Sequence, residues 1–324
     1  MYRNVGEYNC LVGISGGKDS TYVIYRLKSH YDAKILTWTW DNGFLTDYAK
    51  ENINRVVKEF DVDHIWIKPD STVTGQAYQQ SIIADCWPCT ACFHFANATP
   101  WKIAYEKKIP FIIHGRTPEQ ILRKPDASTF ESPYSLIADN LAPYDKDRVI
   151  EISKNHMRKI NKIKEWLLHN ESVRELGLKN VYLSPDFAFS KDFAVEELAF
   201  FLYEIHDEPY MMDVLSEKTN WVRPEDTSLF GHADCSAHEA AGYMYQKMNK
   251  SLLLDYEISA AIRHNKLDRQ KGLEIINKAA KDASVFPEES MNILSEASSI
   301  SKKSLKNMHR RIKYKSVIKS VLGK

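Results

Sequence analysis

Long apolar runs are absent from this sequence of 324 residues, and charge of either sign is not in excess. No run approaches the roughly 20 apolar residues that a membrane-spanning helix needs, so no membrane partner is expected. The formal net charge of +1 provides no global field that would attract nucleic acid. Any nucleic-acid partner must therefore be bound by a local basic patch.

Cysteine is scarce, with five residues, and the count is odd. No basic segment followed by an apolar core stands at the start of the sequence, so a secreted, disulfide-bonded protein is not expected. We expect a reduced, cytoplasmic protein whose thiols are free for chemistry or for metal binding. The hydrophobic content of 44% is sufficient for one large or two medium domains.

Short apolar segments alternate with amphipathic segments between residues 8 and 115. The pattern predicts strands at 10–14, 34–40, 64–67 and 109–113, and helices at 49–60 and 101–107. Such alternation is typical of an α/β fold with a doubly wound, mostly parallel sheet covered by helices. Ligands of these sheets bind beyond the carboxyl ends of the strands.

Helical patterns dominate after residue 191. They predict helices at 193–205, 210–218, 237–248, 253–263, 267–283 and 287–298. We therefore expect three regions: an α/β domain at 1–135, an insertion with the last sheet strand at 136–190, and a helical region at 191–324. The insertion is interpreted either as a lid over the site or as a peripheral helix for oligomer contacts, so a homodimer is a candidate assembly.

A glycine pair follows the first predicted strand, in Ser15-Gly16-Gly17-Lys18-Asp19-Ser20-Thr21. Glycines at the junction between a strand and a helix let the backbone approach an anion, and the helix N-terminus favours negative charge. Lys18 adds a mobile positive charge, and Ser15 and Ser20 add hydroxyl groups. The segment therefore predicts a phosphate-binding loop, although a plain turn with capping serines would use the same residue types.

This loop resembles the Ser-Gly-Gly-x-Asp-Ser signature of the PP-loop ATP pyrophosphatases, which have a Rossmann-like fold. The resemblance implies that residues Ser15, Gly16, Gly17, Lys18, Asp19 and Ser20 bind ATP with Mg²⁺. Enzymes of this superfamily adenylate a carbonyl-type oxygen of their substrate, release pyrophosphate, and let a nucleophile displace AMP. We expect Lys18 to neutralise the leaving pyrophosphate and Asp19 to orient the loop or a magnesium-bound water.

Two further strand ends carry candidate nucleotide-binding residues. Asp41 follows the second predicted strand, where the superfamily places the nucleoside, and turn initiation is the alternative role of Asp41-Asn42-Gly43. Gly115 and Arg116 follow the strand at 109–113. The Arg116 guanidinium could bind two phosphate oxygens at once, or could be an ordinary surface side chain.

Three cysteines are concentrated in Cys86-Trp87-Pro88-Cys89-Thr90-Ala91-Cys92, and a further cysteine is Cys235. Thiolates at this spacing can bind a metal or a cluster, form a redox or sulfur-relay pair, or be inert. The arrangement resembles PP-loop enzymes that form 2-thiocytidine or thiouridine in tRNA. That resemblance implies a [4Fe-4S] cluster held by Cys89, Cys92 and Cys235.

Zinc is the alternative ion for this site, with Cys89, Cys92, Cys235 and His238 as ligands. Cys86 is either a spare thiol or a conditional fourth ligand. We expect Cys10, which lies in the first predicted strand, to be a core residue.

A second resemblance involves Cys86-Trp87-Pro88-Cys89 and Asn220-Trp221-Val222-x-Pro224. These segments look similar to N-acetyl-sugar amidotransferases, which use ammonia as the nucleophile. The N-terminal cysteine motif typical of that family is absent here.

The last segment, 302–324, carries nine Lys and Arg residues and no Asp or Glu. Its apolar residues Leu305, Met308, Ile312 and Ile318 share one helical face, which predicts a packed helix with a solvated basic side. Binding of a tRNA backbone is the alternative interpretation.

We therefore predict an ATP-dependent sulfurtransferase that replaces a carbonyl or amide oxygen of a tRNA or a small molecule with sulfur. The sulfur would pass through the cluster or a cysteine persulfide, from a donor such as a cysteine desulfurase. An amidotransferase-like enzyme and a non-catalytic ATP-binding sensor are the alternatives.

Overall fold

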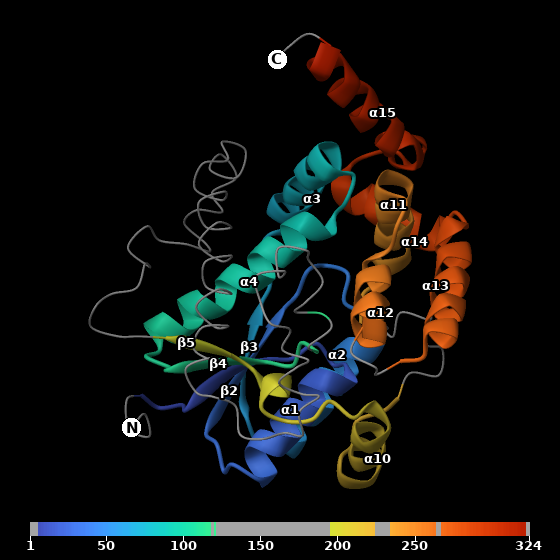
Figure 1. Cartoon of the computed structure of the whole chain (residues 1–324). Helices are drawn as coiled ribbons and strands as arrows, with labels where there is room; N and C mark the ends of the chain where they lie inside the picture. Colours follow the sequence, from blue (N-terminus) through green and yellow to red (C-terminus); the bar gives the residue numbers. More distant parts are fainter. Residues whose placement is uncertain (1–5, 118–119, 121–194, 224–233, 264–266, 322–324) are drawn as a thin grey trace.

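The computed structural model describes residues 6–117, 120, 195–223, 234–263 and 267–321 (Figure 1). The predicted insertion at 136–190, with the last sheet strand that was expected in it, lies outside the described residues. The predicted division into three regions therefore stays a prediction.

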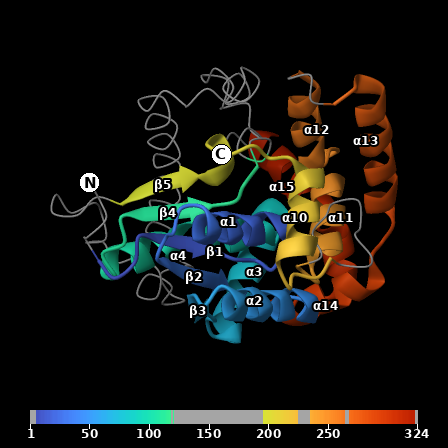
Figure 2. The same cartoon turned by 90° about the horizontal axis from the view of Figure 1, so that it is seen from below.

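Five parallel strands form the sheet of the described residues. They are β1 (Cys10–Gly13), β2 (Ile35–Trp40), β3 (Asp63–Ile67), β4 (Phe111–His114) and β5 (Glu196–Ala199), in the order β3-β2-β1-β4-β5. This order reverses between β1 and β4, where doubly wound sheets bind their ligands. The predicted α/β fold class is confirmed, and Figure 2 shows the five strands side by side.

Helices pack on both faces of the sheet because successive side chains of a strand point to opposite faces. Cys10 and Val12 belong to one apolar cluster, and Leu11, between them, belongs to the other. The first cluster contains side chains of α1 (Lys18–Ser29), α2 (Asp47–Glu59) and α10 (Glu208–Lys218). The second contains side chains of α3 (Ser71–Asp85), α4 (Cys89–Glu106), α11 (His238–Asn249), α14 (Glu288–Ser298) and α15 (Lys302–Val321).

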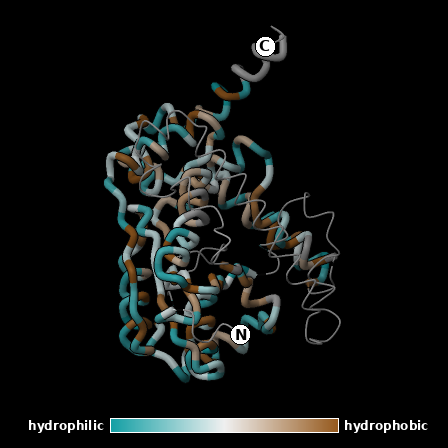
Figure 3. Tube along the Cα trace, turned by 90° about the vertical axis from the view of Figure 1, so that its left-hand side faces the viewer, coloured by the Kyte–Doolittle hydropathy of each residue, from teal (hydrophilic) through white to brown (hydrophobic). Residues whose placement is uncertain are grey.

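The helical C-terminal region packs beside the sheet domain. Helices α12 (Leu253–Arg263) and α13 (Arg269–Ser284) contact each other, and α13 contacts α11. Helix α15 contacts α3, α11 and α14, and its far end extends away from the rest of the molecule, as Figures 1 and 3 show from two directions. Within the described part of the chain, no helix combines the length and the apolar character needed to cross a membrane.

Three features of the fold differ from the sequence-based expectation. The predicted helix at 193–205 is wrong: the chain forms β5 and then a short 3-10 helix, η3 (Phe200–Leu202). The open edge of β4 explains the difference, since residues 196–199 pair with it in parallel and place Leu198 beside Ile113. Helix α3 was not predicted, and α4 begins at Cys89 rather than at residue 101.

Candidate functional site

The glycine loop lies at the point where the strand order reverses. It leaves β1 after Gly13 and enters α1 at Lys18, with Gly17 at the N-cap position. Gly17 has no side chain that could cap the helix, so the first-turn amides remain suited to an external anion. Gly16 has a φ of +81°, and a Cβ there would lie 2.5 Å from the Ala49 carbonyl oxygen of α2. Only glycine fits this position.

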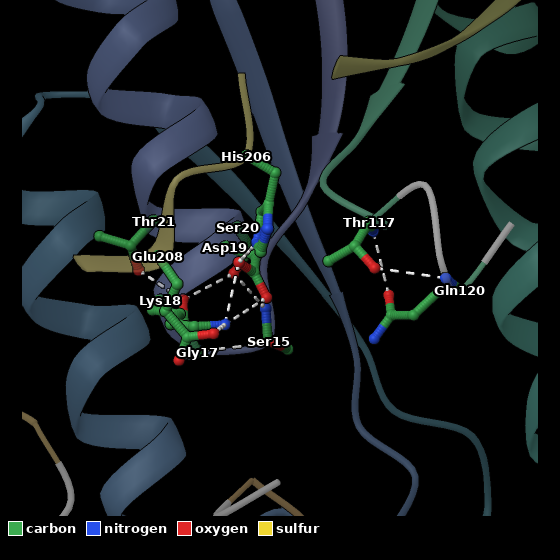
Figure 4. A network of polar contacts seen from close by, with 10 residues as sticks. All are labelled: Ser15, Gly17, Lys18, Asp19, Ser20, Thr21, Thr117, Gln120, His206 and Glu208. Atoms are coloured by element: carbon green, nitrogen blue, oxygen red, sulfur yellow. Dashed lines mark hydrogen bonds and ion pairs between the residues drawn. The ribbon is translucent and has the colours of Figure 1, made fainter. Parts of the chain in front are cut away.

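Four charged or titratable side chains gather at the start of α1 (Figure 4). Lys18 Nζ lies 3.0 Å from an Asp19 carboxylate oxygen and 3.8 Å from Glu208 Oε2. His206 Nε2 lies 2.9 Å from Asp19 Oδ1. Burial acts to raise the pKa of Asp19, but the hydrogen bond from His206 and the positive charge of Lys18 outweigh it and lower the pKa. Asp19 is therefore ionised at neutral pH.

The predicted hydroxyl groups are used partly within the loop itself. Ser20 Oγ donates to the Gly17 carbonyl at 3.2 Å and accepts from the Ser15 amide at 3.3 Å. Ser15 Oγ accepts from the Gly17 amide at 3.4 Å. These contacts shape the loop, and a direct contact of Ser15 or Ser20 with phosphate stays a prediction.

The end of β2 forms a turn, and Asp41 has the turn-forming role that was the alternative to nucleoside binding. Asp41 Oδ1 accepts from the Gly43 amide at 3.1 Å, and its carboxylate lies 3.9 Å from Lys68 Nζ. Gly43 has a φ of +80°. The role of Asp41 beside a nucleoside stays a prediction.

The end of β4 lies against the start of α1. A Cβ at Gly115 would lie 3.1 Å from Val23 and 3.2 Å from the Asp19 backbone, so the absence of a side chain permits this close approach. The Arg116 amide donates to His114 Nδ1 at 3.3 Å. Arg116 thus follows a strand that ends beside the glycine loop, as a phosphate-binding arginine would require.

Two of the predicted cysteines converge although 143 positions separate them. Asn42 Nδ2, at the end of β2, lies 3.7 Å from Cys92 Sγ and 4.0 Å from Cys235 Sγ. A β-bridge between Leu45 and Cys235 holds the two segments together. Burial raises the pKa of the Cys92 thiol to about 11 and that of Cys235 to about 12. Both thiols are therefore protonated at neutral pH unless a cation or a reaction partner lowers their pKa.

The other candidate ligands lie nearby in the chain. Cys89 is the first residue of α4, one turn before Cys92, so the two residues share a helix face. His238 is the first residue of α11, and its amide donates to the Cys235 carbonyl at 3.1 Å. Among the residues that the structure describes, no three His, Cys, Asp or Glu side chains are grouped as a metal site. The cluster and the zinc alternative stay proposals.

The remaining two thiols lie in the core. Cys86 is 1% exposed, and its Sγ lies 4.0 Å from the Met244 carbonyl oxygen. Burial raises its pKa to about 11. Cys10 is 2% exposed within β1, which confirms the predicted core position.

Several residues that contact the loop were not predicted as site residues. His206 and Glu208 contact Asp19 and Lys18, and Trp221 Nε1 donates to the Gly16 carbonyl at 2.9 Å. They lie 187 to 205 positions after the loop residues that they contact, so no local pattern connects them with the loop. Trp221 belongs to the segment that resembles N-acetyl-sugar amidotransferases. That resemblance was the one sequence signal for any of these three residues.

Comparison with known proteins gives limited similarity. No protein family model matches the chain. An uncharacterised protein of Methanocaldococcus jannaschii is 28% identical over 115 residues, which is 36% of this chain and 40% of that protein. The chain thus matches less than half of the length of this curated relative.

Among solved structures, the U34-tRNA thiolase NcsA from Methanococcus maripaludis, determined with its [4Fe-4S] cluster, is similar at 11% identity and a TM-score of 0.34. The match covers 88% of this chain and 75% of that chain.

Proposed function

We propose that this protein is an ATP-dependent sulfurtransferase of the PP-loop type. It would adenylate a carbonyl or amide oxygen of its substrate with ATP and Mg²⁺, release pyrophosphate, and replace the oxygen with sulfur. The observation that carries the proposal is the position of two features at one edge of the sheet. The glycine loop follows β1, and the Asn42–Cys92–Cys235 group follows the adjacent strand β2.

The loop supports the first half of the reaction. A triphosphate at the α1 N-terminus would meet backbone amides and the Lys18 ammonium group. Lys18 would exchange its contacts with Asp19 and Glu208 for phosphate oxygens, and would neutralise charge that develops on the leaving pyrophosphate. The ionised Asp19 carboxylate fits a magnesium-bound water as its partner.

The thiol pair supports the second half. In the proposed reaction the substrate oxygen attacks the α-phosphorus of ATP, and the bond to pyrophosphate breaks. Hydrosulfide, supplied as free sulfide or released by a thiol reductant from a persulfide donor such as a cysteine desulfurase, then attacks the activated carbon, and the carbon–oxygen bond breaks to release AMP and a proton. Cys92 and Cys235 lie where such sulfur could be held.

The donor set fits a thiolate-bound cluster in part, because two of the three cysteines converge on Asn42 and Cys89 lies one turn away. A [4Fe-4S] cluster would be held by Cys89, Cys92 and Cys235, and when bound it would supply a soft metal site for sulfur. In the cluster-free form of the proposal, a persulfide donor transfers its outer sulfur to Cys92 or Cys235, and that sulfur attacks the activated carbon as AMP leaves. The other thiol then attacks the cysteine sulfur, which releases the thiolated product and leaves a Cys92–Cys235 disulfide that a thiol reductant returns to the dithiol.

One observation favours a second function. Trp221, from the motif similar to N-acetyl-sugar amidotransferases, is 6% exposed and contacts the glycine loop directly. The same loop chemistry with ammonia as the nucleophile would give an amidotransferase-like enzyme. The nucleophile therefore has to be tested directly.

The test uses protein purified without oxygen and incubated with ATP, Mg²⁺ and bulk tRNA. Sulfide is added as the sulfur source or ammonium as the nitrogen source. We expect AMP, pyrophosphate and thionucleosides with sulfide, measured by mass spectrometry of the digested tRNA. Lys18→Ala should reduce pyrophosphate release at least 100-fold, since electrostatic contributions of this kind amount to about 3 kcal/mol.

The cysteine variants separate the two half-reactions. Cys92→Ser and Cys235→Ser should abolish thionucleoside formation, whereas Cys10→Ala, in the core, should retain it. Iron and sulfide analysis of the same samples would show whether a cluster is bound. Full activity of both serine variants with ammonium and a nucleotide sugar would overturn the sulfurtransferase proposal in favour of the amidotransferase.

A further inference from the structure

The segment that follows β5 returns across α1 and touches the glycine loop at two places. It begins at η3, continues through Glu204 and His206 into α10, and reaches Trp221 after that helix ends. Glu204 attaches it to α1, because the Arg26 guanidinium donates to its carboxylate at 2.9 and 3.1 Å and the Tyr31 hydroxyl donates at 2.6 Å. We refer to residues 204–222 of this segment, which follow η3, as the brace.

The first contact of the brace with the loop is a hydrogen bond between His206 and Asp19. Since the Asp19 carboxylate is ionised, it can only accept, so His206 Nε2 carries the proton and donates over 2.9 Å. The imidazole ring packs edge-on against Phe201, with the ring centres 4.7 Å apart. The contact with Phe201 therefore restrains the imidazole ring. The ring in turn fixes the orientation of the Asp19 carboxylate beside Lys18 (Figure 4).

The second contact fixes the backbone of the loop. The Gly16 carbonyl accepts from Trp221 Nε1 at 2.9 Å and from Asn52 Nδ2 at 3.3 Å. Asn52 is buried and also exchanges two hydrogen bonds with the backbone of Val222, at 2.9 and 3.1 Å. Because a peptide unit is planar, fixing the Gly16 carbonyl also fixes the direction of the Gly17 amide.

We propose that Trp221 and His206 are positioning residues for nucleotide binding, which hold the Gly16–Gly17 peptide and the Asp19 carboxylate in the arrangement that receives the triphosphate. This inference rests on the proposed function of the loop. A carbonyl that turned toward the site would repel phosphate oxygens, and the hydrogen bond from Trp221 prevents this turn. Asp19 Oδ1 accepts from both Lys18 and His206, so the carboxylate keeps a hydrogen-bond partner and its orientation when Lys18 moves to phosphate oxygens. The brace supplies no group to the reacting atoms.

The experiment compares nucleotide affinities by calorimetry on full-length protein. Trp221→Phe retains an aromatic ring and removes the donor to Gly16, and His206→Phe does the same for Asp19. Each should weaken ATP binding about tenfold, the effect of about one hydrogen bond. Adenosine, which lacks phosphates, should bind each variant within twofold of the parent, because only the phosphate-binding part of the site is altered.

Three further variants make the result decisive. His206→Gln retains a donor and should restore most of the ATP affinity. Trp66→Phe, at an exposed position of β3, and His309→Phe, in α15, are matched substitutions away from the loop and should bind ATP as the parent does. Circular dichroism and thermal unfolding establish that each variant is folded.

Each outcome has a distinct meaning. Folded Trp221→Phe and His206→Phe proteins that bind ATP like the parent, or that lose ATP and adenosine affinity equally, would overturn the inference. A parent protein that binds no ATP would overturn the proposed function together with it. The two contacts are separate in the structure, so if one variant does not fold, the other still decides the question.

Discussion

At the residue scale, His64 is a half-buried base that the fold keeps neutral. The Thr37 hydroxyl donates to the Asp63 carbonyl at 2.8 Å, so its oxygen accepts from His64 Nδ1 at 2.9 Å. His64 Nε2 is buried and has no hydrogen-bond partner among the described residues. Burial accordingly lowers the pKa of His64 to about 4.

This environment predicts a specific loss of stability in acid. The unfolded chain binds a proton on His64 near pH 6.5, whereas the folded chain does so only near pH 4. The full stabilisation is therefore present above pH 6.5 and is lost as the pH falls toward 4. Between pH 7 and 4.5 the parent should lose on the order of 1 kcal/mol more unfolding free energy than His64→Gln, measured by urea unfolding. This is less than the full linkage value because solvent reaches part of the side chain. Parallel pH profiles for the two proteins would contradict this.

Two glycines of the site permit a matched comparison. Gly16 and Gly43 have almost the same positive φ, +81° and +80°, but a Cβ would meet the Ala49 carbonyl oxygen at 2.5 Å only at Gly16. Gly43→Ala should therefore cost about 1 kcal/mol of unfolding free energy, from backbone strain alone. Gly16→Ala should cost roughly 3 kcal/mol and also abolish ATP binding. Urea unfolding and calorimetry measure the two effects, and equal costs at both positions would refute the close approach of Ala49.

At the element scale, the sequence predicted β1 to β4 because each is a short apolar run next to a turn or a helix. The loop after β1 could also be predicted from local sequence, because its glycines, lysine and serines are adjacent in the chain. β5 was misassigned because Glu-Glu-Leu-Ala favours a helix by propensity, and pairing with the β4 edge overrides that preference. The local sequence pattern of residues 196–199 cannot reveal the open edge of β4, because that edge belongs to a distant part of the chain.

The thiol site shows the same division between local and distant information. The spacing of Cys89 and Cys92 was informative because both begin one helix. The approach of Cys92 and Cys235 to each other was expected, but their shared contact with the Asn42 amide was not. Its cause was not visible in the sequence: the Leu45–Cys235 bridge joins the end of β2 to the start of α11. His206 could not be identified as a partner of Asp19 because its contact arises only after β5 pairs with β4.

At the scale of the whole molecule, α15 attaches the basic C-terminal segment to the core. Leu305 and Met308 are 1% and 5% exposed, and Ile312 packs against the same cluster. The predicted packing of this helix face is confirmed for these residues. Burial lowers the pKa of His309 most, and the positive charges of Arg310, Lys250, Lys313 and Lys247 lower it further. The exposed Arg310 and Lys313 of α15 therefore lie near Lys247 and Lys250 at the end of α11. A local basic surface therefore exists on a chain of nearly neutral net charge.

Two truncations separate packing from nucleic-acid binding. Removal of 302–324 takes Leu305 and Met308 out of the core and should cost roughly 4 kcal/mol of unfolding free energy. Removal of 314–324 leaves both residues in place and deletes only three lysines, 315, 319 and 324. The shorter truncation should leave thermal unfolding unchanged. If the basic surface binds an RNA backbone, it should also weaken binding of bulk tRNA and make the plot of log affinity against log salt less steep by up to about 2.

The salt dependence decides what the surface does. A phosphate contact releases counterions, so each lysine that binds RNA contributes to the slope, whereas a lysine that only keeps the helix soluble contributes nothing. An equal slope for the parent and the shorter truncation would assign residues 314–324 to solvation alone. A parent protein without any salt-sensitive tRNA binding would favour a small-molecule substrate, because the activated oxygen would then have to enter the site without an RNA backbone to hold it.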